Sequence, residues 1–77
     1  MKYRVIETEA FYPEYRYTEV YDDLKPAQAR MKGLYRELVI EGNYEAIDHS
    51  EYHPMSAWVK LNDGNEIAWD IEEIEED

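Results

Sequence analysis

Two alternating runs around an Asn-Asp-Gly stretch constrain the fold of this chain more than any other feature. In "SAWVKLNDGNEIAWDIEE", residues 56–73, apolar and polar side chains alternate on both sides of residues 62–64. A period of two is typical of a half-buried β-strand, and Asn, Asp and Gly favour tight turns. The sequence therefore predicts an antiparallel hairpin near its C-terminus.

The register of this hairpin follows from which side chains share a face. A two-residue loop at Asp63-Gly64 places Lys60 beside Ile67 and so mixes polar with apolar positions. A three-residue loop, in which a type I turn precedes a left-handed Gly64, separates the two kinds of side chain and sets Lys60 opposite Glu66. We therefore predict the three-residue loop, with an apolar face made of Ala57, Val59, Leu61, Ile67, Trp69 and Ile71.

Residues 23–41 have the pattern of an amphipathic helix. Asp22 or Asp23 is suited to cap it, Pro26 falls in the first turn where a missing N–H is harmless, and Gly42-Asn43 is a natural stop. On a helical wheel the apolar side chains fall within an arc of about 100°, and basic side chains lie nearly opposite. The apolar stripe comprises Leu24, Ala27, Met31, Leu34, Tyr35 and Leu38, and the basic ridge comprises Lys25, Lys32 and Arg36.

The other segments complete an α+β domain. "KYRVIETEA" and "EYRYTEVY" are rich in β-forming residues and predict an antiparallel pair, with a bend at "FYPE" around Pro13. "YEAID" predicts a short strand and "HSEYHP" a loop. We expect one domain over residues 1–77: a small antiparallel sheet of four to five strands, in ββαββ or ββαβββ order, with one helix packed on one face. Residues 73–77 are expected to form a frayed acidic tail.

Charge is distributed unevenly along the chain. The formal net charge is −11, with a net of +1 on residues 1–36 and −12 on residues 37–77. Such a field repels nucleic acid and anionic membranes and attracts basic protein surfaces, although acidity also serves solubility alone. We therefore expect a protein partner and no direct binding to nucleic acid or membrane. The chain has no Cys and no apolar run longer than three residues, which favours a soluble, cytoplasmic protein.

No motif in the sequence predicts catalysis. The one metal-like cluster is "DHSEYHP", but His49 and His53 would share a face only on a helix, and Pro54 disfavours a helix there. A Gly-rich phosphate loop and a nucleophile elbow are both missing from the sequence. We therefore predict that the protein is not an enzyme and has no catalytic residue, cofactor or metal site.

The predicted last strand carries a row of carboxylates opposite its core face. Glu66, Asp70 and Glu72 project there, with Ala68 as a gap, and alternate strand positions lie about 6.8 Å apart. This spacing is similar in scale to the phosphate spacing of a nucleic-acid strand. Trp58 points to the same side, either as an exposed anchor or covered by a loop. The predicted partner-binding residues are Glu45, Asp48, Glu51, Trp58, Glu66, Asp70, Glu72 and Glu73.

In size, lack of Cys, acidity and aromatic content, the chain resembles the small inhibitors of phages and mobile elements, such as anti-CRISPR and anti-restriction proteins. The resemblance implies an inhibitor that imitates nucleic acid and blocks the basic groove of a DNA- or RNA-binding enzyme. It assigns a role to no individual residue, because the class shares no motif with this sequence. The alternative is a non-enzymatic adaptor or regulatory module, monomeric or homodimeric, that docks through Trp58 and exposed tyrosines.

Overall fold

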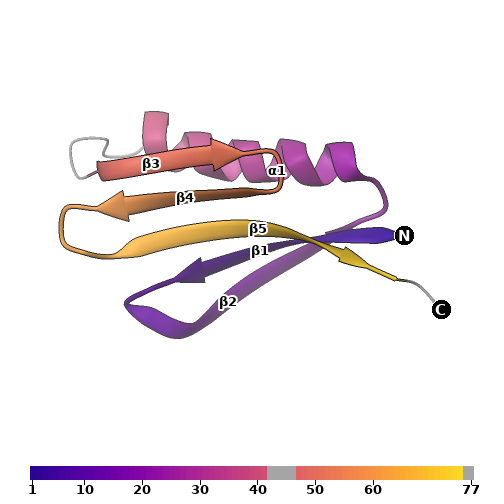
Figure 1. Cartoon of the computed structure of the whole chain (residues 1–77), viewed down its shortest axis with the longest axis horizontal. Helices are drawn as coiled ribbons and strands as arrows, with labels where there is room; N and C mark the ends of the chain where they lie inside the picture. The colour runs from indigo at the N-terminus through magenta and orange to yellow at the C-terminus, as the bar shows by residue number, and fades with distance from the viewer. Residues whose placement is uncertain (42–46, 76–77) are drawn as a thin grey trace.

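The computed structural model shows one five-stranded antiparallel sheet and one helix packed on it (Figure 1). It describes residues 1–41 and 47–75, the side chains of Ile40 and Glu41 excepted. The order ββαβββ confirms the predicted α+β fold. The elements are β1 (Lys2–Glu9), β2 (Tyr12–Tyr21), α1 (Leu24–Arg36), the π-helical turn η1 (Glu37–Glu41), β3 (Ile47–His53), β4 (Ser56–Leu61) and β5 (Glu66–Ile74).

The strand order is β2-β1-β5-β4-β3, and every neighbouring pair is antiparallel. The last strand, β5, is therefore the central one, and β2 and β3 form the two edges (Figure 1). Because Lys2 pairs with Ile74, β1 begins and β5 ends at the same end of the sheet. A central strand has hydrogen-bonding neighbours on both sides, so the side chains of β5 are held in fixed positions.

The predicted register of the C-terminal hairpin is confirmed. Lys60 lies opposite Glu66. The N–H of Gly64 donates to the carbonyl of Leu61 over 3.0 Å, and the N–H of Leu61 donates to the carbonyl of Asn65 over 2.8 Å. Gly64 has a φ of 94°, which is the left-handed conformation that this loop requires. The hairpin therefore has a three-residue loop.

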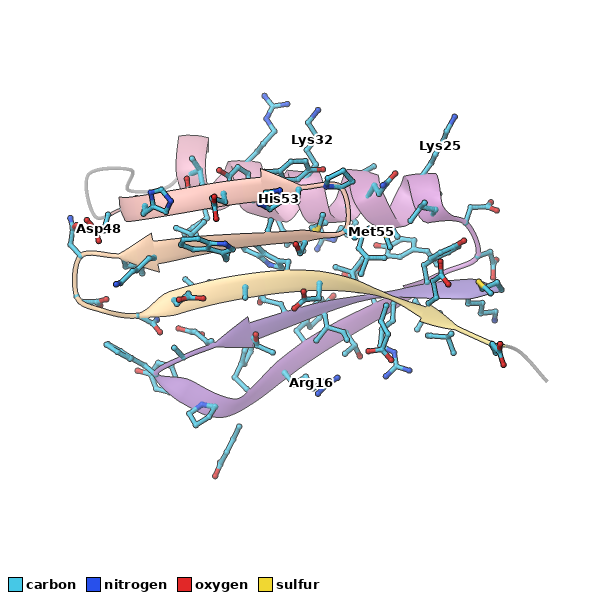
Figure 2. All side chains as sticks on the ribbon, in the orientation of Figure 1. Arg16, Lys25, Lys32, Asp48, His53 and Met55 are labelled. Carbon is cyan, nitrogen blue, oxygen red and sulfur yellow. The ribbon has the colours of Figure 1, made fainter. Side chains whose placement is uncertain are left out.

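Helix α1 begins where the sequence indicates. Asp23 occupies the N-cap position, but its side chain makes no capping hydrogen bond. Pro26 lies in the first turn, where its missing N–H costs nothing. Lys25 and Lys32 point away from the sheet, so they belong to the solvated side of the helix (Figure 2). The predicted stop at Gly42-Asn43 lies outside the described residues.

The core lies between α1 and one face of the sheet, and it contains the predicted apolar positions of both. Tyr35 joins the two layers: its ring meets that of Trp69 edge-on at 6.2 Å, and its hydroxyl donates to Ser50 Oγ at 3.0 Å. Aromatic pairs of this kind add about 0.5–1.5 kcal/mol beyond the area they bury. The buried cluster consists of Val5, Ala27, Met31, Ala57, Val59, Trp69 and Ile71.

Two predictions about irregular segments were wrong. Pro13 was expected in a bend, but the turn lies at Ala10-Phe11 and Pro13 belongs to β2, an edge strand where a missing N–H is tolerated. "HSEYHP" was expected to be a loop, but β3 extends through His53. As an edge strand packed on one side, β3 needs few apolar residues; Tyr52 supplies one contact, 5.4 Å from the Tyr35 ring. Of the expected strand "YEAID", residues 44–46 lie outside the described residues.

The first two residues of the expected acidic tail, Glu73 and Ile74, belong to a strand. Glu73 pairs with Tyr3 and Ile74 with Lys2, so these two residues belong to β5 and not to a frayed end. The strand is longer than its alternating pattern indicates because β1 offers partners as far as Lys2. Residues 76–77 lie outside the described part of the chain.

Candidate functional site

Neither of the described helical segments covers the face of the sheet opposite α1, which we call the open face, and Trp58 of β4 lies on it. Antiparallel partners share a face, and those of Trp58 are Ala68 on β5 and Glu51 on β3. The His49 ring packs against the indole with its centroid 5.1 Å away. Trp58 is therefore half-buried: its neighbours cover part of the indole and leave the rest accessible to a partner.

Carboxylates follow the central strand across the same face. Glu66, Asp70 and Glu72 of β5 are all exposed, and Ala68 leaves a gap between the first two. Alternate residues of a strand are about 6.8 Å apart. Because β1 and β4 both pair with β5, the row is carried on backbone that is hydrogen-bonded on both sides.

Basic side chains stand next to this row without pairing to it. Lys60 is the cross-strand neighbour of Glu66, and Arg4 is that of Glu72. Within the described residues, however, none of the three β5 carboxylates has a basic nitrogen within 4.0 Å. Exposed charges at such separations attract weakly and keep their hydration. The negative charge of the row is thus partly compensated by Lys60 and Arg4, but the carboxylates remain accessible to a partner.

An apolar side chain interrupts the charges of the open face. Ile6 of β1 lies between Thr18 and Asp70 and is 6% exposed, although it faces away from the helical segments that the structure describes. The side chains around it provide this burial. Trp58, Ala68 and Ile6 therefore give the open face an apolar component among its acidic and basic residues.

The structure places most of the predicted partner-binding residues on one face of the sheet. Five of the eight predicted residues, namely Glu51, Trp58, Glu66, Asp70 and Glu72, share the open face. Glu73 was grouped with them but pairs with Tyr3 on the helix side. Asp48 lies at the register shift that begins β3, where it is exposed (Figure 2). Glu45 lies outside the described residues. Arg4 was not among the predicted residues, because only the strand order brings it beside Glu72.

A second charged cluster joins the helix to the edge strand β2. The Glu19 carboxylate accepts hydrogen bonds from the hydroxyls of Tyr17 and Tyr21 and from Arg30 Nε, the last at 3.1 Å. The hydrogen bond from Tyr17 is the largest cause that lowers the pKa of Glu19, followed by that from Tyr21. The same bond to Glu19 is the main cause that raises the pKa of Tyr17. This cluster holds α1 against β2.

Two kinds of site are absent from the described part of the chain. No group of three His, Cys, Asp or Glu side chains among residues 1–41 and 47–75 is arranged to hold a metal ion. The helical segments that the structure describes are too short and too polar to cross a membrane.

Comparisons with protein families, with curated proteins and with solved structures find no match to this chain. The fold class is therefore taken from this structure alone. Function has to be inferred from the side chains that the fold brings together.

Proposed function

We propose that this chain is a non-catalytic inhibitor whose open sheet face occupies a basic, nucleic-acid-binding groove of another protein. The observation that supports this most is the row of Glu66, Asp70 and Glu72, which is exposed on a central strand and has no ion pair within the described residues. A partner's Lys and Arg side chains can approach these carboxylates without first breaking an internal salt bridge. Complementary charge of this kind raises the association rate and disfavours wrong partners.

The spacing and stiffness of the row also favour this proposal. Carboxylates about 6.8 Å apart are comparable in scale to the phosphates that such a groove binds. Because β5 is already ordered, its backbone loses little conformational freedom on binding. The net charge of −11 adds long-range attraction to a basic surface. The class resemblance to small acidic inhibitors of phages and mobile elements agrees with the same function.

A second candidate function is supported by Trp58. An adaptor docks through this half-buried indole, and Lys60 beside Glu66 and Arg4 beside Glu72 add basic charges to the same face. Tryptophan is enriched among the residues that dominate binding energy. The edges β2 and β3 also make a homodimer by strand pairing possible for this candidate, and light scattering after size-exclusion chromatography tests it.

The experiment that separates the two candidates begins with capture of a partner. The immobilised protein is incubated with cytosolic extract and eluted with rising salt and then with duplex DNA, and eluted proteins are identified by mass spectrometry. The proposed inhibitor is expected to release a nucleic-acid enzyme under both conditions, because salt screens the contact and DNA competes for the groove. A partner that resists both supports the adaptor.

Matched variants then test the face itself. The double variant Asp70→Asn/Glu72→Gln is expected to weaken binding to the recovered partner by about tenfold or more. The control Asp23→Asn/Glu75→Gln removes the same amount of charge outside the row. It is expected to weaken binding to the partner by about twofold. A larger loss for Trp58→Ala than for the acidic double variant favours the adaptor. Equal losses for the double variant and its control would contradict a specific acidic row.

A further inference from the structure

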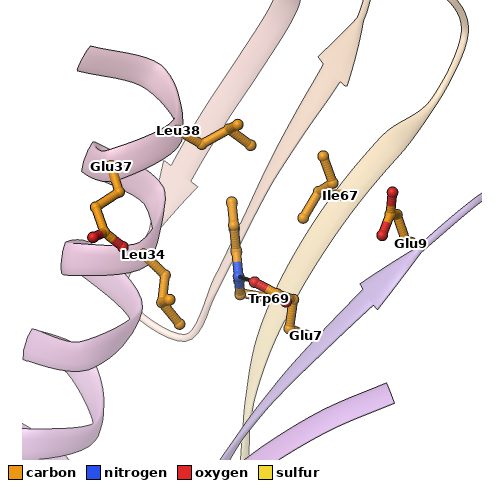
Figure 3. A pocket seen from close by; sticks show the side chains of 7 residues that line it. All are labelled: Glu7, Glu9, Leu34, Glu37, Leu38, Ile67 and Trp69. Atoms are coloured by element: carbon orange, nitrogen blue, oxygen red, sulfur yellow. Dashed lines mark hydrogen bonds between the residues drawn. The ribbon is translucent and has the colours of Figure 1, made fainter. Parts of the chain in front are cut away.

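A pocket of about 310 Å³ lies on the other side of the sheet, between the helical segments and strands β1 and β5 (Figure 3). Four apolar side chains and three carboxylates line it. We call it the acidic pocket, and its residues are Leu34, Leu38, Ile67, Trp69, Glu7, Glu9 and Glu37. The volume is at the small end of the range for ligand pockets, about 300–1,000 Å³, which suits a single side chain better than a large cofactor.

Neutral donors orient two of the three carboxylates. Glu7 accepts a hydrogen bond from the indole Nε1–H of Trp69 at 2.7 Å and another from the hydroxyl of Tyr15 at 2.7 Å. Glu9 accepts one from the Asn65 side-chain nitrogen at 2.9 Å. Figure 3 shows Glu7 meeting the edge of the Trp69 indole beside the pocket. These bonds fix the carboxylates in place but leave their negative charge uncompensated.

The chain's own cations do not neutralise the pocket. Within the described residues, Glu7, Glu9 and Glu37 have no basic nitrogen within 4.0 Å. Arg30 and Arg36 line a second hollow that shares Glu37 with the acidic pocket, and Arg30 forms an ion pair with Glu19. Three carboxylates and four apolar side chains therefore line the same pocket, and a carboxylate has lone pairs for more hydrogen bonds than these residues receive.

Among protein side chains, arginine matches these surroundings best. Its aliphatic stem can pack against Leu34, Leu38 and Ile67, and its guanidinium carries five donors for the carboxylates. The guanidinium is also more weakly hydrated than a lysine ammonium, so its transfer into a partly apolar pocket is less costly. We propose that the acidic pocket binds an arginine side chain presented by a basic segment of a partner protein. This site lies on the opposite side of the sheet from the open face and does not depend on it.

The test uses a short peptide as the probe. Acetyl-Gly-Arg-Gly-amide is titrated into the ¹⁵N-labelled protein, and the indole N–H signals of Trp69 and Trp58 are followed by NMR. We expect a saturable shift for Trp69, whose N–H bonds to Glu7, and no comparable shift for Trp58 on the other face. The citrulline peptide, which has nearly the same shape without the charge, is expected to bind about tenfold more weakly, and the lysine peptide to fall between them.

Substitutions at exposed positions show whether the arginine peptide binds in the acidic pocket, without disturbing the fold. Glu37 is exposed on η1, so Glu37→Gln should leave the fold intact and weaken the arginine peptide about threefold to tenfold. Glu37→Lys, which brings a cation to the pocket, should abolish binding. Glu72→Gln removes the same charge from the open face and should change the affinity by less than about twofold.

Four results would overturn the proposal: no saturable shift of Trp69, equal binding of the arginine and citrulline peptides, equal shifts of both indoles, or equal effects of Glu37→Gln and Glu72→Gln. The last two would indicate attraction to the net charge of the protein as a whole. A negative result for the acidic pocket would not contradict the proposed function of the open face, because Asp70→Asn/Glu72→Gln tests that face separately.

Discussion

The side-chain oxygen of Asn65 accepts a hydrogen bond, 3.0 Å long, from the backbone N–H of Phe11, which lies 54 positions earlier in the chain. The same oxygen accepts a bond from the N–H of Glu66, and the side-chain nitrogen donates to Glu9 at 2.9 Å. Asn65 is the one polar residue that is buried within the described part of the chain. It ties the β4–β5 loop to the β1–β2 turn, and therefore joins two hairpins that are distant in sequence.

Replacing this side chain should destabilise the fold. Asn65→Ala removes the hydrogen bonds of this buried side chain to the Phe11 N–H and to Glu9, and at about 0.5–1.5 kcal/mol for each bond the expected loss is about 1–3 kcal/mol. Urea unfolding followed by tryptophan fluorescence measures the change. Asn65→Asp retains the accepting oxygen but sets a carboxylate beside Glu9, so it should be more harmful at pH 7 than at pH 4. A loss below about 0.5 kcal/mol for Asn65→Ala would show that the bonds add little to stability.

Met31 should be the most sensitive position of the helix. Its side chain is completely buried between α1 and the sheet, so Met31→Ala creates a cavity and should lower the free energy of unfolding by about 2–5 kcal/mol. The next residue, Lys32, points away from the sheet (Figure 2). Lys32→Ala should therefore change the free energy of unfolding by about 0.5 kcal/mol or less. Chemical denaturation of both variants measures the contrast, and similar losses would contradict the packing described above.

Glu19 should make stability depend on pH. Hydrogen bonds from Tyr17 and Tyr21 lower its pKa in the folded state, so the folded state favours the deprotonated carboxylate. The resulting stabilisation is complete above the ordinary glutamate pKa of about 4.3 and is lost as the pH falls through the lowered folded value. The difference in free energy of unfolding between the wild type and Glu19→Gln should therefore be largest at neutral pH and shrink in acid.

Urea unfolding of both proteins from pH 7 to about pH 3 measures this difference. Glu14→Gln, an exposed position of the same strand, serves as the control and should show a small difference at every pH. If the effect of Glu19→Gln stays constant down to pH 3, the hydrogen bonds to Glu19 do not favour its charged form.

Salt should stabilise the monomer. Residues 37–77 carry a net charge of −12, and most of the acidic side chains that the structure describes form no ion pair within 4.0 Å. Screening of their mutual repulsion should raise the melting temperature between about 10 and about 200 mM NaCl. Circular dichroism in NaCl and in KCl measures the rise and should give the same curve for both salts. A melting temperature that does not change would mean that the repulsion is already compensated, for example by the basic ridge of α1.

The parts of the fold that could be predicted are those that local pattern specifies. The Lys60–Glu66 pairing followed from period-two alternation, because any other register would expose apolar residues. The burial of Met31 followed from helical periodicity in the same way. Strand β3 was missed because an edge strand packs on one side only, and its polar residues are compatible with either a loop or a strand.

The sequence by itself determined the helix, the C-terminal hairpin, the composition of the core and the unequal distribution of charge, since each depends on residues that are close along the chain. The tertiary structure alone decided that β5 is the central strand, that Arg4 stands beside Glu72, and that Asn65 bonds to Phe11. It also brought Glu37 of the helical segment to the carboxylates of β1 around the acidic pocket. These relationships join residues far apart in sequence, and which of them form depends on how the whole chain buries its apolar surface and satisfies its backbone hydrogen bonds.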